Sequence, residues 1–345
     1  MPSDPASPFE TACPMNPTPA EATDPRDLET PVDLPPVEPP SAGFIVQLFV
    51  IPAIIVAVVV VVWLLFGKLA GGERDAMSYV ETMKSPSANW RAAFELSTLI
   101  QNDARLGQDP RLLGELANLL DQDLGLKTDE KLLQYLALTL GTFQTLDAVT
   151  ESGKKVDVVA VLAKAMEESR PAEVRIAAAA SLAKQAARLD GRLDDPRAAR
   201  ALASARTSDA VELRKIAAFA LGFLGGPDAA AALKAALDDE DRDVRYNAAA
   251  ALGRRGDLAA LGNFREMLSD RDLNTLLAPL PEPERRSRIE AIELEALNAL
   301  GVASAAGRLD LPRALRPDVE ALGRSGLVSV RSRAQEVLKT LPAGR

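Results

Sequence analysis

The sequence contains no histidine, and Cys13 is its only cysteine among 345 residues. A disulfide within the chain is therefore impossible. The same absences exclude a Ser-His or Cys-His nucleophile pair, histidine-ligated zinc and metal sites built from clustered thiolates. We therefore expect no metal and no other cofactor, and we expect the protein not to be an enzyme.

Aromatic residues are also scarce. They make up 4% of the chain against 47% hydrophobic residues, and the apolar content is mostly Ala, Leu and Val. This composition favours closely packed helices over a β-sandwich or a barrel, so we expect an all-α protein.

The net charge is low outside one segment. The net charge is -9, of which residues 1–42 carry -7 and the other 303 residues only -2. A nearly neutral body has no field that would attract nucleic acid, and the densest basic groups, Arg254-Arg255 and Arg285 to Arg288, are interpreted as a helix end and a solvated helix start. No phosphate-binding glycine motif occurs, so we predict neither a nucleic-acid partner nor a small-molecule substrate.

Residues 1–42 hold twelve of the 24 prolines and show neither helical nor strand periodicity. This composition is typical of a disordered, acidic, partly polyproline II tail. Such a tail could be a ligand for a groove in a partner or a solvated spacer. Because short Pro-rich matches are weak signals, the spacer is the preferred interpretation.

Residues 43–67 carry no charge. Twenty-five residues at about 1.5 Å each reach about 37 Å, enough to cross a bilayer as a helix. A signal peptide would start with a short basic region instead of 42 acidic, Pro-rich residues, and a buried core helix would show a polar face. The segment therefore predicts a single transmembrane helix, with Trp63 near one interface.

The orientation follows from the flanking charges. Lys68, Arg74 and Lys84 lie on the C-terminal side of the segment, whereas only Arg26 lies near its N-terminal side. The positive-inside rule thus favours a cytoplasmic location for the rest of the chain. We expect a single-pass membrane protein.

From residue 73 onward a helical phrase repeats, most clearly over 241–253. Asp243 is expected to cap the helix start, and Val244, Ala248 and Leu252 fall on one buried stripe. Gly253 is expected to take the left-handed conformation that ends the helix. In the same copy Arg245 follows the first valine.

Other copies begin with Val174-Arg175, Leu213-Arg214 and Val330-Arg331, and the second of these ends at Gly222. The copies recur every 31 to 48 residues, and each interval has room for one further helix. A coiled coil or an ordinary helical bundle is the alternative, but this period, broken by Gly, Pro and Asp, is too short and too regular for long heptads. Residues 73–345 therefore predict an α-solenoid of about six to seven helix pairs. We expect first helices near 111–120, 156–167, 198–205, 229–237 and 258–268.

The phrase Asp-x-x-Val-Arg-x-x-Ala-Ala-x-Ala-Leu-Gly resembles that of HEAT repeats, including the short type found in bacterial proteins. The resemblance implies a curved stack of antiparallel helix pairs whose concave face and loops hold protein partners. It also implies that arginines pair with turn aspartates of adjacent repeats, and the matching positions are Arg175, Arg214, Arg245 and Arg331.

Two acidic clusters, 194–195 and 238–241, lie between expected helices and are interpreted as helix caps. The Pro-rich interruption at 274–285 is interpreted as a tolerated extension and not as a functional loop.

Taken together, the sequence predicts a membrane-anchored scaffold or adaptor that binds a protein partner, whose identity it leaves open. The alternatives are an enzyme accessory or lyase of the HEAT-like type and a structural envelope protein.

Overall fold

The computed structural model describes residues 43, 51–70, 76–85, 89–126, 128–189 and 193–341. The chain divides into two compact units, Met1–Gly72 and Glu73–Arg345. The tail predicted for residues 1–42 lies outside the described residues. Each unit is considered by itself below.

The described part of the first unit is helix α2 (Ile51–Ala70), whose side chains are exposed wherever they are placed. Of the predicted span of 43–67, residues 44–50 lie outside the described residues, and α2 covers the span from Ile51 onward. Within the described residues, no helix has both the length and the apolar character required to cross a membrane. The predicted transmembrane helix is therefore not confirmed.

The second unit consists of helices, and its one strand-like feature among the described residues is an isolated antiparallel bridge between Val149 and Lys155. This confirms the predicted all-α class. Its α-helices are α3 (Ala76–Lys84), α4 (Trp90–Asn102), α5 (Pro110–Asp123), α6 (Glu130–Leu140), α7 (Val158–Ala165), α8 (Ala172–Arg188), α9 (Pro196–Ser204), α10 (Val211–Leu221), α11 (Gly226–Ala236), α12 (Arg242–Arg254), α13 (Leu261–Met267), α14 (Asp270–Leu276), α15 (Glu282–Ala305), α16 (Asp310–Ala314), α17 (Arg316–Leu322) and α18 (Val328–Thr340). Short 3₁₀ turns occur at η2 (Leu106–Gln108), η3 (Ala205–Thr207) and η4 (Leu258–Ala260).

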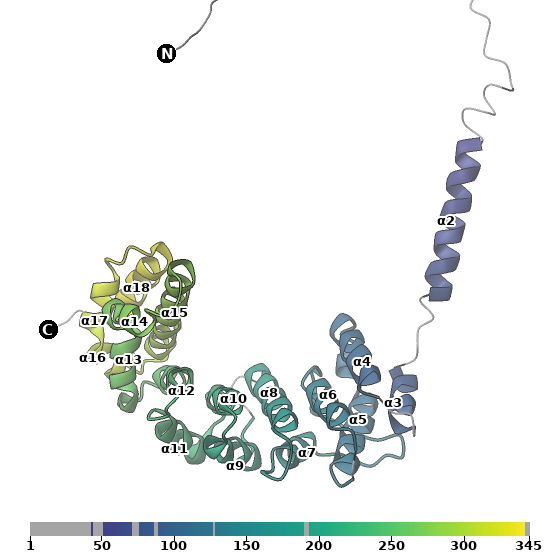
Figure 1. Cartoon of the computed structure of the whole chain (residues 1–345), viewed down its shortest axis with the longest axis horizontal. Helices are drawn as coiled ribbons and strands as arrows, with labels where there is room; N and C mark the ends of the chain where they lie inside the picture. Colours follow the sequence, from purple (N-terminus) through teal and green to yellow (C-terminus); the bar gives the residue numbers. More distant parts are fainter. Residues whose placement is uncertain are drawn as a thin grey trace, which may run out of the picture. The chain divides into compact units, whose positions relative to one another are not determined.

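These helices pack as successive antiparallel pairs. The second helices of the pairs, α4, α6, α8, α10, α12, α15 and α18, each pack against the next one along the chain, and we call them the inner helices. Figure 1 shows them along the inner side of a curved row, with α5, α7, α9 and α11 on the outer side. The arrangement is a helical-repeat solenoid, as the period of the sequence predicted.

Helix starts follow the acidic clusters of the sequence. Asp195 accepts a hydrogen bond from the backbone N–H of Arg197, and Asp241 accepts from the N–H groups of Asp243 and Val244. The proline after Asp195 lies at the first helical position, where its missing N–H costs nothing. The capping interpretation of both clusters is thereby confirmed.

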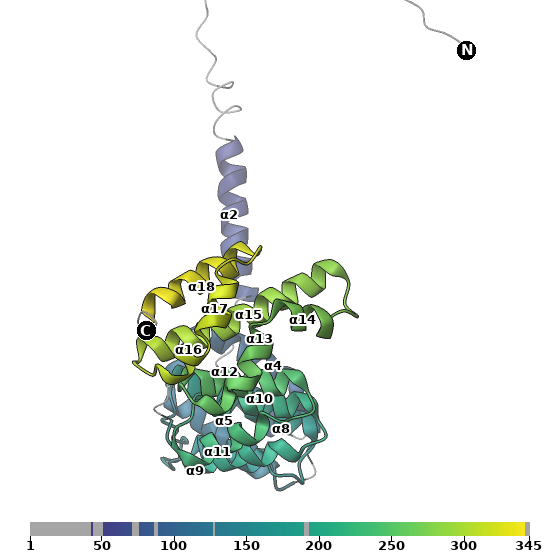
Figure 2. The same cartoon turned by 90° about the vertical axis from the view of Figure 1, so that its left-hand side faces the viewer.

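The predicted first helices correspond to α5, α7, α9 and α11, and the last of them to η4 with α13. The Pro-rich interruption at 274–285 contains the end of α14 and the start of α15. Figure 2 shows α14 beside the first half of α15, at one edge of the unit. With 24 residues, α15 is longer than the other inner helices, and its first turns extend beyond the stack.

Candidate functional site

Polar side chains fix how neighbouring inner helices stack. Each donates to a backbone carbonyl of the preceding inner helix or of the turn that follows it, so burial leaves no donor unsatisfied at these points. The contacts are Ser181 Oγ to the oxygen of Ala137 (2.6 Å), Gln185 Nε2 to that of Phe143 (2.9 Å), Asn247 Nδ2 to that of Lys215 (3.1 Å) and Arg255 Nη2 to that of Leu224 (2.6 Å). The inner face is therefore a rigid platform for any surface residues that it carries.

The apolar residues of the repeated phrase belong to the core of this platform. Val174, Leu213, Val244 and Val330 are buried. They hold the pairs together and are not available to a partner.

The arginines of the phrase bind backbone carbonyls in the turn before their own helix. The bonds are Arg175 Nε to Met166 O (3.2 Å), Arg214 Nη1 to Ser208 O (2.9 Å), Arg245 Nη1 to Asp239 O (2.8 Å) and Arg331 Nη1 to Ser325 O (2.7 Å). The aspartate pairing implied by the resemblance occurs at Arg214. Its guanidinium also donates two hydrogen bonds to the Asp239 carboxylate, which lies in the turn of the next helix pair. Each of these arginines therefore stabilises the turn that precedes its own helix.

Gly253 differs from its expected role. Helix α12 continues through it to Arg254, and the positive φ that follows the helix, +69°, belongs to Gly256. A Cβ atom on Gly253 would lie 2.2 Å from Cζ of the buried Phe264 of α13. On Gly222, a Cβ atom would lie 2.9 Å from Cβ of Ala251 in the next inner helix. Both glycines permit close packing, and neither ends a helix by a left-handed turn.

This packing role gives a testable prediction. We expect Gly253→Ala to lower the free energy of unfolding by about 2 kcal/mol, because overpacking against Phe264 outweighs the better helix propensity of alanine. The matched control is Gly262→Ala in α13, where a Cβ atom meets nothing within 4 Å. That variant should be neutral or up to about 1 kcal/mol more stable. Urea denaturation followed by circular dichroism measures both, and equal effects would contradict the packing argument.

Asp243 also differs from its expected role, because Asp241 is the residue that caps α12. The Asp243 carboxylate instead lies 2.7 Å from Arg288 Nη2 of α15 and 3.6 Å from Lys215 Nζ of α10. Burial opposes ionisation of this carboxyl, but Arg288, Lys215 and Arg242 outweigh burial and keep the pKa of Asp243 below its ordinary value. One carboxylate thus links three successive inner helices.

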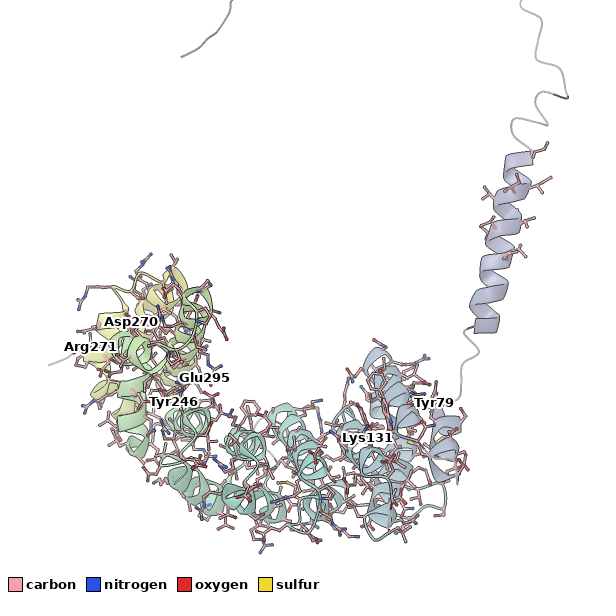
Figure 3. The ribbon with its side chains drawn as sticks, viewed as in Figure 1. Tyr79, Lys131, Tyr246, Asp270, Arg271 and Glu295 are labelled. Carbon is pink, nitrogen blue, oxygen red and sulfur yellow. The ribbon has the colours of Figure 1, made fainter. Side chains whose placement is uncertain are left out.

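A groove with a volume of about 340 Å³ lies over this ion-pair cluster. Its walls come from α10, α12 and α15, with Met267 of α13 at one side. Figure 3 labels Tyr246 and Glu295, which line the groove from α12 and α15. Phe219 of α10 is its exposed apolar residue, with 43% of its surface accessible.

Sequence reasoning missed this groove, although one signal was present. Phe219 occupies the position at which two other copies of the phrase have Ala180 and Ala250. A large aromatic residue at a position that elsewhere needs only a methyl group indicates a role outside the core. Tyr246, whose hydroxyl donates to Glu266, is the second aromatic of the groove.

A separate aromatic cluster lies on the first two inner helices. Trp90 of α4 stacks on Tyr135 of α6 with ring centroids 5.0 Å apart, and Phe94 meets Tyr135 edge-on at 5.9 Å. Phe94 is 50% exposed, and the guanidinium of Arg91 lies over the Trp90 ring. In a chain with few aromatics, this cluster is the second concentration of exposed ring surface on the inner helices.

No group of three or more His, Cys, Asp or Glu side chains within the part of the chain that the structure describes could hold a metal ion. Of the carboxylates that line the groove, Asp243 and Glu295 are engaged in ion pairs between helices.

Comparison with known proteins agrees with the architecture. Residues 199–278, from α9 to just beyond α14, match the family model of HEAT repeats. No curated protein matched the chain. The unit is therefore a helical solenoid that contains HEAT repeats over this range.

Similar solved structures include the complex of CpcE and CpcF of phycocyanin lyase from Nostoc sp. (18% identity, 77% of this chain and 94% of that chain, TM-score 0.43). A designed armadillo repeat protein is also similar (18% identity, 77% and 99% covered, TM-score 0.37), as is human deoxyhypusine hydroxylase in complex with glycerol (15% identity, 80% and 98% covered, TM-score 0.30). Similarity at this level says nothing about partners or chemistry.

Proposed function

We propose that this protein is a binding scaffold whose inner helices hold a segment of a protein partner in the groove over α10, α12 and α15. The observation that carries the proposal is the exposed Phe219 ring within a groove whose rim is charged. Protein interfaces are typically built this way, with aromatic anchors at the centre and polar groups around them.

The dimensions of the groove suit a polypeptide. Packed helices lie about 8–10 Å apart, so three inner helices offer a track of about 20 Å. At about 3.3 Å per residue, an extended segment of roughly six residues would cross it. The fixed ion pairs of Asp243 would keep this track rigid and so lower the entropic cost of binding.

Photo-crosslinking in cells tests this proposal. With benzoylphenylalanine in place of Phe219, we expect a covalent adduct to a discrete polypeptide. The control places the same group at Leu258, which is 51% exposed and lies outside the groove. Adducts of equal yield and identity at both positions, or none at Phe219, would rule out the groove as the binding site.

We propose binding without catalysis. The absence of histidine, together with a single cysteine, supports this over a lyase or an accessory enzyme. No feature of the groove favours the alternative of a structural envelope protein.

We further propose that residues 43–67 hold the protein in a membrane, with residues 73–345 on the cytoplasmic side. The uncharged sequence of this segment and the exposed Val and Ile side chains of α2 support the proposal. We expect the protein to stay in the membrane pellet after alkaline carbonate extraction and a variant lacking residues 43–67 to be released. Release of the intact chain would contradict the anchor, and protease accessibility of sealed vesicles tests its orientation.

A further inference from the structure

Helix α15 carries a carboxyl group in an unusual environment. Glu293 is fully buried, at 0% exposure. Neither of its carboxylate oxygens has a hydrogen-bond partner among the described residues. A buried ionised carboxylate without a partner costs several kcal/mol, so the group is retained at neutral pH in its protonated form.

The surroundings of Glu293 reinforce this state. Burial raises its pKa, and together with the smaller effect of the carboxylates of Asp270 in α14 and Glu290 in α15 it brings the pKa to about 8. The helices packed against α15 are α12, α13, α14, α16 and α18. Of these, α14 contributes Asp270, while Ser329 of α18 donates to Glu290. No charged group from α12, α13, α16 or α18 within the described ranges acts on Glu293.

The segment 269–281, which contains α14, contributes Asp270 to the surroundings of this carboxyl. Its buried apolar anchors are Leu273 and Leu277, with Leu280 partly buried. Its recorded side-chain hydrogen bonds all join two of its own residues. They are Ser269 Oγ with the N–H of Asp272, Asn274 Nδ2 with the oxygen of Asp270, and Thr275 Oγ1 with the oxygen of Arg271.

Space is available beside this segment. A hollow of about 650 Å³ lies between it, the first turns of α15 and residues 318–327. Ser269, Asp270 and Asn274 form the wall that the segment contributes. Figure 3 labels Asp270 and Arg271 at the start of α14. Movement of the segment would reshape this hollow without disturbing the stacked inner helices.

We propose that segment 269–281 is a pH-controlled flap, which leaves α15 when Glu293 releases its proton to solvent and thereby opens the hollow beside it. The ionised carboxylate requires hydration, and the Asp270 carboxylate repels it. Of the elements around Glu293, the flap can be displaced by breaking the contacts of three leucines. This device is independent of what the groove over α10, α12 and α15 binds.

Hydrogen exchange of the full chain, read by mass spectrometry from pH 6 to 10, tests the flap. After correction for intrinsic exchange, we expect the protection of 269–281 to fall about tenfold per pH unit up to about pH 8, because the carboxyl is ionised in the open state and protonated in the closed state, and to be constant above pH 8, where both states are ionised. Helix α17 is the internal control, because it has the same length as α14 and no buried carboxyl without a partner is recorded on it. Its corrected protection should not change.

The matched variants are Glu293→Gln and Asp270→Asn. The first is expected to make the protection of 269–281 independent of pH. The second removes a charge that raises the pKa of Glu293, so we expect the fall in protection to end at a lower pH than in the unmodified protein. Should Glu293→Gln fail to fold, Glu293→Met serves as the uncharged variant. Constant protection in the unmodified protein, or an equal fall in the uncharged variant or in α17, would overturn the proposal.

Discussion

Replacing Arg214 with methionine is expected to lower the free energy of unfolding by about 3–5 kcal/mol. The guanidinium is bidentate to Asp239, with Nε at 3.0 Å from one carboxylate oxygen and Nη2 at 3.1 Å from the other, and it also bonds Glu240. Both Arg214 and Asp239 are more than nine-tenths buried. Without the arginine, the buried Asp239 carboxylate loses its counter-ion, and the turn of the next helix pair loses the hydrogen bonds that connect it to α10.

Two comparisons isolate this effect. Adding Asp239→Asn to the Arg214 variant should recover a large part of the loss, because the stranded charge is then absent. Arg197→Met removes an arginine that also contacts two carboxylates, Asp157 and Asp195, but is 45% exposed. It should cost at most about 1 kcal/mol. A cost for Arg214→Met no larger than this in urea denaturation would contradict the role of the buried pair.

The stability of the protein is expected to fall by roughly 3–4 kcal/mol between pH 5 and pH 8 on account of Glu293 alone. Its pKa rises from an ordinary value of 4.5 to about 8 in the folded protein, chiefly through burial. The folded state therefore binds a proton that the unfolded state has released, so each rise in pH within this interval favours unfolding. Above pH 8 both states are ionised and the dependence ends.

The variant Glu293→Gln should lack this slope when the free energy of unfolding is measured across the same pH range. Glu115 provides the matched case, because hydrogen bonding to Lys84 at 2.8 Å lowers its pKa instead. Its contribution is present at neutral pH and is lost on acidification, so Glu115→Gln should leave the slope between pH 5 and 8 unchanged. A slope that persists in Glu293→Gln would show that another group is responsible.

Much of the fold could be predicted because small apolar residues at helical spacing leave few ways to be buried. Val174, Leu213 and Val244 recur at the same point of each phrase, and all three are core residues of inner helices. The roles of Asp243 and Gly253 could not be predicted in this way. A local pattern identifies a cap or a helix end, but their true contacts, Arg288 and Phe264, come from other helices.

The candidate site was still less accessible to sequence reasoning. Phe219 differs from the corresponding Ala180 and Ala250, but nothing in the sequence alone shows that this position faces the same groove as Glu295, which lies in a later helix pair. The buried Glu293 has no sequence signal, since glutamate is common on helices and is mostly exposed.

The sequence by itself determined the class of fold, the repeating helix pairs and the helix caps at Asp195 and Asp241, because each depends on residues close together along the chain. Tertiary structure alone decided which surface residues of different inner helices lie side by side and which carboxyl group, that of Glu293, is buried. The physical reason is that groove shape and desolvation depend on the stacking of helices from different pairs, which sets neighbours that are distant in sequence.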